Sequence, residues 1–270
     1  MAIATVLYQA KGGNEVWLVD LERNGAPSKQ TFNDASDRFA IWSPDDDQLV
    51  FTSSRGQQED SYLKRTTATA EELISTHAPG APVPTSWSAK GFLLYTAVWK
   101  GPEELWVHPM SAGGKPFQIL ATPAADRVQG QFAPDGRFVA YVSNESGPYD
   151  VYVAPFDAQA TGVRVSTAGG DLPRWNSDGT ELFYVQPGRD AASNPTLMAA
   201  TLVREARHVR VVKVTELFSV RPAIPVGPDQ SYFYDVADDT ERFLVNRGPD
   251  LESSPAPITV VVDWLAGKPQ

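Results

Sequence analysis

The sequence predicts an all-β protein: a β-propeller of about six four-stranded blades, with the first and last blades incomplete. A motif made of one aromatic residue, a polar turn and an alternating strand recurs along the chain. Its aromatic residues Trp42, Trp87, Phe132 and Trp175 are spaced 45, 45 and 43 residues apart, close to the period typical of propeller blades. The 22 prolines and 20 glycines, spread over 270 residues, suit many short strands and turns.

The expected blades fill a single domain, residues 1–270, and cover approximately residues 1–33, 37–77, 82–121, 126–167, 170–220 and 228–267. In the unit Gln131–Phe156, apolar residues alternate from Phe138 onward, which is the period-2 pattern of a strand. Asp135-Gly136 before that strand predicts a tight hairpin turn, because glycine adopts a positive φ without steric cost. Asp46 occupies the same turn position in the second blade and tolerates this conformation. The repeated tryptophans are expected to pack between neighbouring blades.

The two ends of the predicted propeller are less regular. A weaker fifth copy of the motif starts at Asp235 and implies an insertion within Pro187–Val226. Residues 5–9, 15–21 and 29–32 resemble the last three strands of a blade, and Pro257–Leu265 is a strand without a following partner. Either the N- and C-terminal strands share one blade, or Met1 is not the natural start of the domain. Ala68–Ser75 has helical character but falls where an outer strand is expected.

Composition narrows the functional classes. The chain carries 33 acidic and 23 basic residues, a formal net charge of −10, and no basic cluster. Nucleic-acid binding is therefore not expected, because polyanions are held by clustered Lys and Arg. Direct membrane insertion is not expected either, because no apolar run approaches the roughly 20 residues that span a bilayer. There is no cysteine, which excludes disulfides, thiolate metal sites and a cysteine nucleophile.

No pattern of catalytic residues is evident, and neither a cofactor nor a metal is expected. The Gly-x-Ser-x-Gly turn of serine hydrolases is absent. His77, His108 and His208 fall at unrelated repeat positions, whereas zinc needs at least three converging ligands. The run Asp45–Asp47 indicates a solvated hairpin turn, because calcium loops space their ligands differently. The sequence predicts that the chain is not an enzyme; the alternative is a metal-dependent propeller hydrolase or lyase.

The candidate site is the mouth of the central channel, which the start of each innermost strand lines in a propeller. The residues at those positions are Asp37, Arg38, Thr85, Arg127, Gln129, Gln131, Asp171, Arg174 and Tyr232. Their arginine, carboxylate and amide groups suit a protein partner or a small polar or anionic ligand. The alternative is that the arginines and carboxylates pair with each other at the rim.

The turns WSPDD, FAPDG and WNSDG resemble those of TolB-type, WD-repeat-like bacterial propellers. Together with Val165–Tyr184, Tyr234–Asn246 and Pro257–Trp264, the unit Phe132–Phe156 is similar to the C-terminal propeller of acidobacterial-type serine/threonine protein kinases and of their free-standing relatives. The resemblance implies a non-catalytic binding or sensing propeller in an extracytoplasmic compartment. An alternative is the regulatory portion of a membrane-linked kinase, whose catalytic domain is absent here because no Gly-rich loop or Asp-Phe-Gly motif is present.

Overall fold

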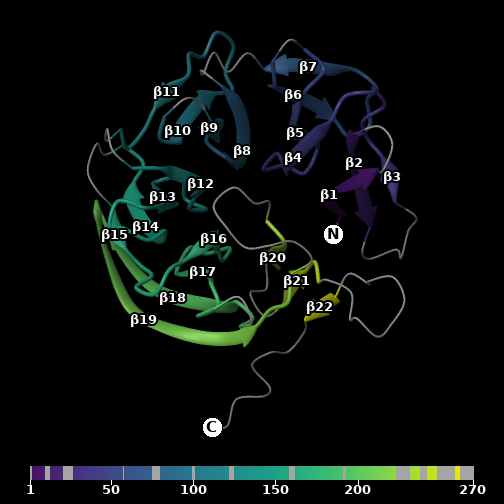
Figure 1. Cartoon of the computed structure of the whole chain (residues 1–270). Coiled ribbons are helices and arrows are strands. Elements are labelled where there is room, and N and C mark those ends of the chain that lie inside the picture. Colours follow the sequence, from purple (N-terminus) through teal and green to yellow (C-terminus); the bar gives the residue numbers. More distant parts are fainter. Residues whose placement is uncertain are drawn as a thin grey trace. The chain divides into compact units, whose positions relative to one another are not determined.

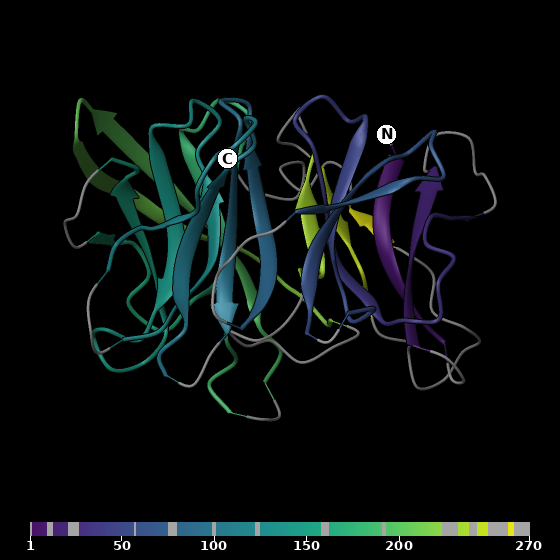
Figure 2. The same cartoon turned by 90° about the horizontal axis from the view of Figure 1, so that it is seen from above.

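A computed structural model describes residues 2–9, 13–20, 27–56, 58–74, 80–98, 101–121, 125–157, 162–190, 193–222, 232–237, 242–247 and 259–261. These residues form six antiparallel sheets, in each of which a strand pairs with the next strand of the chain (Figures 1 and 2). No helix occurs within the described ranges. The predicted all-β class with repeated antiparallel sheets is confirmed.

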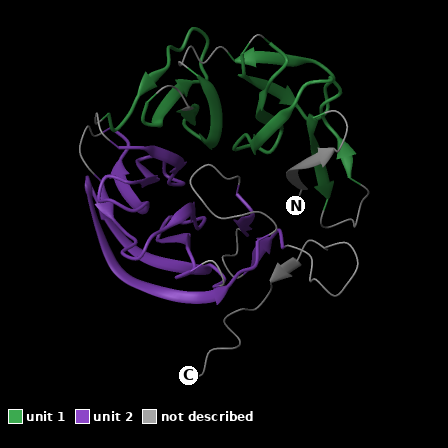
Figure 3. Ribbon diagram, viewed as in Figure 1, with its two compact units in different colours: residues 1–123 green, residues 124–270 purple. Residues whose placement is uncertain are grey.

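The chain divides into two compact units, Met1–Pro123 and Ala124–Gln270 (Figure 3). The sheets of unit 1 are β1-β2-β3, β4-β5-β6-β7 and β8-β9-β10-β11. Their bounds are Ala2–Gln9 (β1), Gly13–Asp20 (β2), Ser28–Lys29 (β3), Asp37–Trp42 (β4), Gln48–Ser53 (β5), Asp60–Arg65 (β6), Glu71–Ile74 (β7), Ala81–Ser88 (β8), Phe92–Val98 (β9), Glu104–Pro109 (β10) and Phe117–Gln118 (β11). The prediction that all blades belong to one domain stays a prediction.

Unit 2 contains the sheets β12-β13-β14-β15, β16-β17-β18-β19 and β20-β21-β22. Their bounds are Arg127–Phe132 (β12), Phe138–Ser143 (β13), Asp150–Pro155 (β14), Val163–Arg164 (β15), Asp171–Trp175 (β16), Glu181–Gln186 (β17), Thr196–Glu205 (β18), His208–Ser219 (β19), Tyr234–Val236 (β20), Phe243–Val245 (β21) and Thr259–Val261 (β22). The insertion predicted between the fourth and fifth motif copies includes the whole of the long β18–β19 hairpin, whose strands have 10 and 12 residues.

The irregular ends have the expected strand content. Within the described residues the first and last sheets each have three strands, and the other four sheets have four. Thr259–Val261 pairs with β21, while the rest of the predicted strand Pro257–Leu265 lies outside the described residues. Glu71–Ile74 pairs with β6 as an outer strand, so the segment with helical character follows the repeat pattern and not its local propensity.

The turn between the first and second strands of a sheet repeats with the same backbone conformation. The residue at the predicted turn position has φ of 57° in Asp46, 79° in Gly91, 62° in Gly136 and 72° in Gly179. In each turn this residue donates its N–H to the carbonyl three residues earlier, at 2.7–3.1 Å. The left-handed position predicted from the sequence is confirmed, and it is occupied once by a residue other than glycine.

Apolar clusters lie between successive sheets of the same unit. Trp42 packs against a cluster that contains Val16 of the preceding sheet, and Trp87 packs against one that contains Val50. In unit 2, Trp175 packs against a cluster that contains Phe138. The tryptophans thus bury their rings between neighbouring sheets, as the repeat predicts. This packing fixes the first strand of each of these sheets, on which the candidate site residues lie.

Candidate functional site

Bulges interrupt three of the first strands at the same repeat position. Pairing with the second strand shifts register between Arg38 and Ile41 in β4, between Val128 and Gln131 in β12, and between Asp171 and Arg174 in β16. The residue three places before the aromatic anchor has a left-handed backbone in each case. Their φ values are 56° for Phe39, 53° for Gln129 and 56° for Leu172. A bulge re-aims the residues around it, so it decides which side chains leave the strand pairing.

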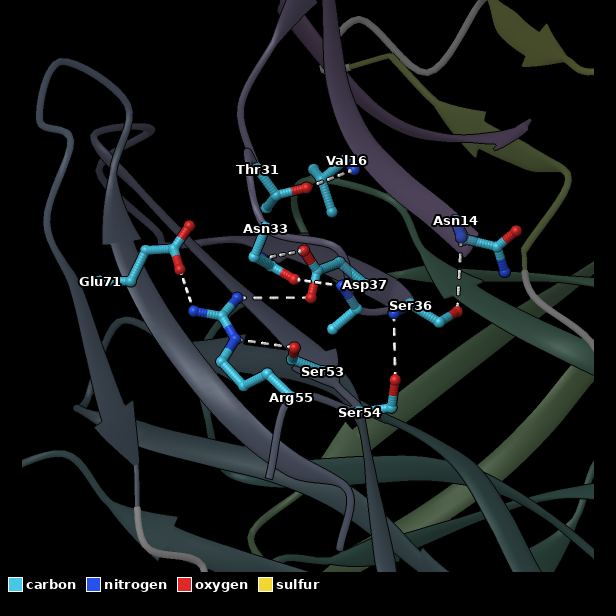
Figure 4. Close-up of polar contacts among 11 residues, drawn as sticks. Asn14, Val16, Thr31, Asn33, Ser36, Asp37, Ser53, Ser54, Arg55 and Glu71 are labelled. Atoms are coloured by element: carbon cyan, nitrogen blue, oxygen red, sulfur yellow. Dashed lines mark hydrogen bonds and ion pairs between the residues drawn. The ribbon is translucent and has the colours of Figure 1, made fainter. Parts of the chain in front are cut away.

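In unit 1 the predicted site residue Asp37 is fully buried and paired within its own sheet (Figure 4). Asn33 Nδ2 donates to its carboxylate at 2.8 Å, and the Arg55 guanidinium lies 3.3 Å from Asp37 Oδ1. Arg55 also pairs with Glu71, and its guanidinium lies 4.0 Å from the Tyr62 ring centroid. The charged groups of this cluster are therefore paired with one another.

The other two predicted residues of unit 1 also have internal partners. Arg38 forms an ion pair with Glu59, which precedes the third strand of the same sheet. Thr85 is buried and donates its hydroxyl to the Leu94 carbonyl at 3.3 Å. The residues predicted in unit 1 are therefore engaged in holding their own sheets.

Arg127 of unit 2 repeats the arrangement of Asp37 with the charges exchanged. Only 4% of Arg127 is exposed, and its Nη2 donates to Glu145 Oε2 at 2.6 Å. Glu145 follows the second strand of its sheet at the place where Arg55 follows the second strand in unit 1. We call Asp37–Arg55 and Arg127–Glu145 the rim pairs.

The remaining predicted residues come together across the first strands of unit 2. Gln129 accepts the Leu172 N–H through Oε1 at 2.6 Å, and its carbonyl accepts the Tyr232 hydroxyl at 3.1 Å. Tyr234 donates its hydroxyl to the Leu172 carbonyl at 2.7 Å. These bonds connect β12, β16 and the β20 segment in chain order, and they use the residues that the bulges turn away from strand pairing.

Arg174 lies at the centre of this arrangement. Its Nη1 donates to Gln131 Oε1 at 2.9 Å, and its guanidinium lies 3.7 Å from the Tyr232 ring centroid. Its Nε lies 3.5 Å from Asp235 Oδ1, an ion pair that does not meet hydrogen-bond geometry, so the buried Nε has no hydrogen-bond partner. Trp175, the next residue, donates its indole N–H to the Gln131 carbonyl at 3.2 Å. The cation is held in a fixed orientation while one of its donors is left unused.

Gln131, Arg174 and Asp235 occupy one repeat position, directly before the anchor of each motif copy. We call this set the polar ladder. It lines an open groove of about 380 Å³ at the ends of β12, β16 and β20. The other lining residues are Phe132, Pro134, Trp175, Asn176, Ser177, Val236 and Ala237. The exposed lining of the groove is mostly polar, so it suits a polar or charged group better than an apolar one.

Sequence reasoning identified Gln131 and Arg174 but missed Asp235 and Tyr234. The signal for Asp235 was present, because it stands one residue before Val236, which the repeat aligns with the aromatic anchors. That register predicts Asp235 beside Arg174. Tyr234 carried no such signal, since its contact depends on the left-handed backbone of Leu172.

Burial controls the protonation of two groups beside the groove. It raises the pKa of the Tyr232 phenol well above the ordinary range, so Tyr232 remains a hydrogen-bond donor at neutral pH. Burial and, to a lesser extent, the negative charge of Asp150 raise the pKa of Asp171 to about 6. Asp171 is 4% exposed and its Oδ1 has no hydrogen-bond partner. The charged form of Asp171 is therefore destabilised in the folded protein.

The described residues contain no group of three His, Asp or Glu side chains that could hold a metal ion. His77 lies outside the described residues, His108 is on β10, and His208 is exposed on β19. Asp45 and Asp46 are exposed in the first turn of their sheet, as expected for a solvated turn. No helix in the described part of the chain is long and apolar enough to cross a membrane.

Comparison with solved structures identifies the class of fold as a TolB-like β-propeller. TolB from Acinetobacter baumannii superposes with a TM-score of 0.67 and 17% identity, over 90% of this chain and 57% of that one. A putative TolB from Agrobacterium tumefaciens gives a TM-score of 0.61 and 16% identity, over 76% of this chain and 75% of that one. An oligogalacturonate lyase in complex with manganese gives 0.60 and 16%, over 96% of this chain and 70% of that one.

These similarities define the fold, which TolB shares here with an enzyme. The chain spans 57% of the length of the Acinetobacter TolB that it resembles. No sequence-family model and no curated protein matches it. The chemistry of the groove itself is therefore what indicates the function.

Proposed function

We propose that the protein is a non-catalytic binding or sensing β-propeller, and that its ligand or partner binds in the unit 2 groove at Arg174. The observation that carries this proposal is the state of Arg174. Its guanidinium is oriented by Gln131 and Tyr232, its buried Nε has no hydrogen-bond partner, and the residue lines an open groove. A buried donor without a partner costs free energy, and a ligand acceptor would recover it.

The test is a thermal-shift screen of small polar and anionic compounds against the native chain and against Arg174→Gln. A ligand of the folded state raises the melting temperature by mass action. Compounds that bind the groove should stabilise the native chain and not the variant. Arg207→Gln is the matched control, because the Arg207 side chain is 64% exposed and lies in the turn between β18 and β19. Its ion-pair partner is Asp157, in the segment after β14. A compound that stabilises Arg174→Gln as much as Arg207→Gln binds elsewhere. If every stabilising compound behaves in this way, the proposal is contradicted.

A second candidate function is metal-dependent catalysis, which the likeness to a lyase with bound manganese favours. A site of this kind predicts that manganese, calcium or zinc raises the melting temperature of the chain. A melting temperature unchanged by all three ions removes this candidate.

The similarity of the turn motifs to kinase-associated propellers supports a more specific version of the binding function. In that version the chain is the extracytoplasmic sensor or regulatory portion of a membrane-linked serine/threonine kinase. An immunoblot of source cells with an antibody against this chain distinguishes the two versions. A product several-fold larger than the 270-residue chain supports the kinase version, and a product of its own size supports a free-standing binder.

A further inference from the structure

We propose that the unit 2 groove binds a carboxylate group and that Asp235 is its built-in competitor, displaced from Arg174 when the ligand enters. This inference rests on the proposed binding function and assigns the chemistry of the ligand. It follows from the contacts that the other two members of the polar ladder, Gln131 and Asp235, make with the Arg174 guanidinium.

The guanidinium is only partly used by the protein. Nη1 is committed to Gln131 at 2.9 Å, and the ring of Tyr232 covers the cation at 3.7 Å. The Nε–H belongs to the edge with which arginine can bind a carboxylate in a bidentate manner. Arginine prefers planar anions in this geometry, and an ion pair with a neighbouring carboxylate already identifies the type of group that fits.

Asp235 is a poor partner for that edge. Its Oδ1 lies 3.5 Å from Arg174 Nε, beyond a good charge-assisted hydrogen bond. The same Oδ1 accepts the Val236 N–H at 3.0 Å, which holds the carboxylate close to its own backbone. The Asp235 side chain is 53% exposed, so it can turn into solvent without leaving a buried charge. A ligand carboxylate that reaches both N–H groups of the edge would therefore replace it.

Arg38 Nε is also buried without a hydrogen-bond partner, so the unused Nε alone does not distinguish Arg174. The rim pairs show that its weak ion pair does. Arg127 and Glu145 are in contact at 2.6 Å, and only 5% and 16% of their side chains are exposed. Arg55 has two carboxylate partners, Asp37 and Glu71. Arg174 combines a single long ion pair with a groove of about 380 Å³ in front of it. A displaceable carboxylate is thus found where there is room for a ligand.

The experiment measures binding of glutarate by isothermal titration calorimetry at constant ionic strength near neutral pH. Glutaramide, its neutral diamide, is the control ligand, and a capped peptide with one glutamate tests whether the carboxylate comes from a small acid or from a peptide. Asp235→Asn keeps an oxygen acceptor for the Val236 N–H but removes the charge. Asp157→Asn, a 63% exposed residue of the same unit, is the charge-matched control.

We expect Asp235→Asn to bind glutarate or the peptide about twofold to fivefold more tightly than the native chain, as expected for loss of an exposed competing ion pair. Arg174→Gln should bind at least about tenfold more weakly, and Arg174→Lys should restore little of the loss because lysine lacks the planar edge. Glutaramide should not bind. Whichever of glutarate and the capped peptide binds more tightly identifies the source of the carboxylate.

Three results would overturn the inference: equal or weaker binding by Asp235→Asn, an equal gain in Asp157→Asn, or absence of carboxylate binding in every variant. The melting temperature of each variant verifies that it is folded. If carboxylates fail while a neutral compound stabilises the native chain but not Arg174→Gln, the proposed binding function stands and only the ligand chemistry is wrong.

Discussion

Two first strands at equivalent repeat positions, β4 in unit 1 and β12 in unit 2, carry the same ion pair with opposite polarity. Asp37 pairs with Arg55 at 3.3 Å, and Arg127 pairs with Glu145 at 2.6 Å. In both cases the partner lies 18 residues further along the chain, directly after the second strand. Because the charges can be exchanged while the positions are kept, these pairs fasten the first strand to the second and do not select a ligand by charge.

The repeat position before the anchor differs between the two units in another way. In unit 1 it is occupied by Ile41, which packs against an apolar cluster, and by Ser86. In unit 2 it is occupied by the polar ladder of Gln131, Arg174 and Asp235. The rim-pair position therefore has the same structural role in both units. The position before the anchor carries the polar ladder only in unit 2. The second kind of position is the better candidate for function.

Reversing one rim pair is expected to have the largest effect. Asp37→Arg places a second guanidinium beside Arg55 in a fully buried position, so we expect the free energy of unfolding to fall by about 3–5 kcal/mol. Adding Arg55→Glu recreates the polarity of unit 2 and should recover part of this loss. Urea denaturation of the single and double variants measures both effects. A double variant no more stable than Asp37→Arg would mean that the two rim pairs are not equivalent.

Arg127→Ala should lower the free energy of unfolding by about 2–4 kcal/mol, because Glu145 loses its partner in a largely buried position. Ligand binding in the unit 2 groove should be unchanged once the variant is folded. Arg137→Ala provides the comparison, since Arg137 is 56% exposed and should cost less than about 0.5 kcal/mol. Loss of ligand binding with unchanged stability would instead place Arg127 in the binding site.

Much of the fold and part of the candidate site could be predicted from the sequence. The spacing of the anchors, 45, 45 and 43 residues, predicted the repeated sheets, the turn at Asp46 and the packing of the tryptophans. It also named Arg174, Gln131 and Tyr232 as candidate site residues, but not their contacts. The sequence left the pairing of Arg127 with a carboxylate open as an alternative, because Glu145 lies in the turn after the second strand, and sequence periodicity does not encode which side chains meet there. Backbone geometry therefore decides which polar residues form rim pairs and which line the groove.

The buried Asp171 should make stability depend on pH in the acidic range. Its pKa is about 6 in the folded protein and about 3.9 in an unfolded chain, so the folded state holds the proton more tightly. This contribution is fully present below about pH 4 and is lost as the pH rises through about 6. Asp171→Asn should remove that loss and be more stable than the native chain at neutral pH by about 2 kcal/mol. Parallel stability–pH curves for the two proteins would show that Asp171 is not the titrating group.

The turns should show the smallest effect of the comparison. Asp46 has φ of 57° where the corresponding turn of unit 2 has Gly136 with φ of 62°. Asp46→Gly should therefore be neutral or stabilise the chain by up to about 0.5 kcal/mol, and Gly136→Asp should destabilise it by about 0.5–1 kcal/mol. Thermal unfolding of both variants provides the measurement. A destabilising Asp46→Gly would mean that the aspartate side chain itself holds the turn.

The central claim is that Arg174 receives the ligand while Arg55 and Arg127 hold the fold. Arginine Nε–H signals in a proton–nitrogen NMR spectrum report on these three residues separately, after assignment by loss of one signal in each single variant. Titration with glutarate should shift the Arg174 signal and leave those of Arg55 and Arg127 in place. A shift of either rim arginine with an unchanged Arg174 signal would contradict the account.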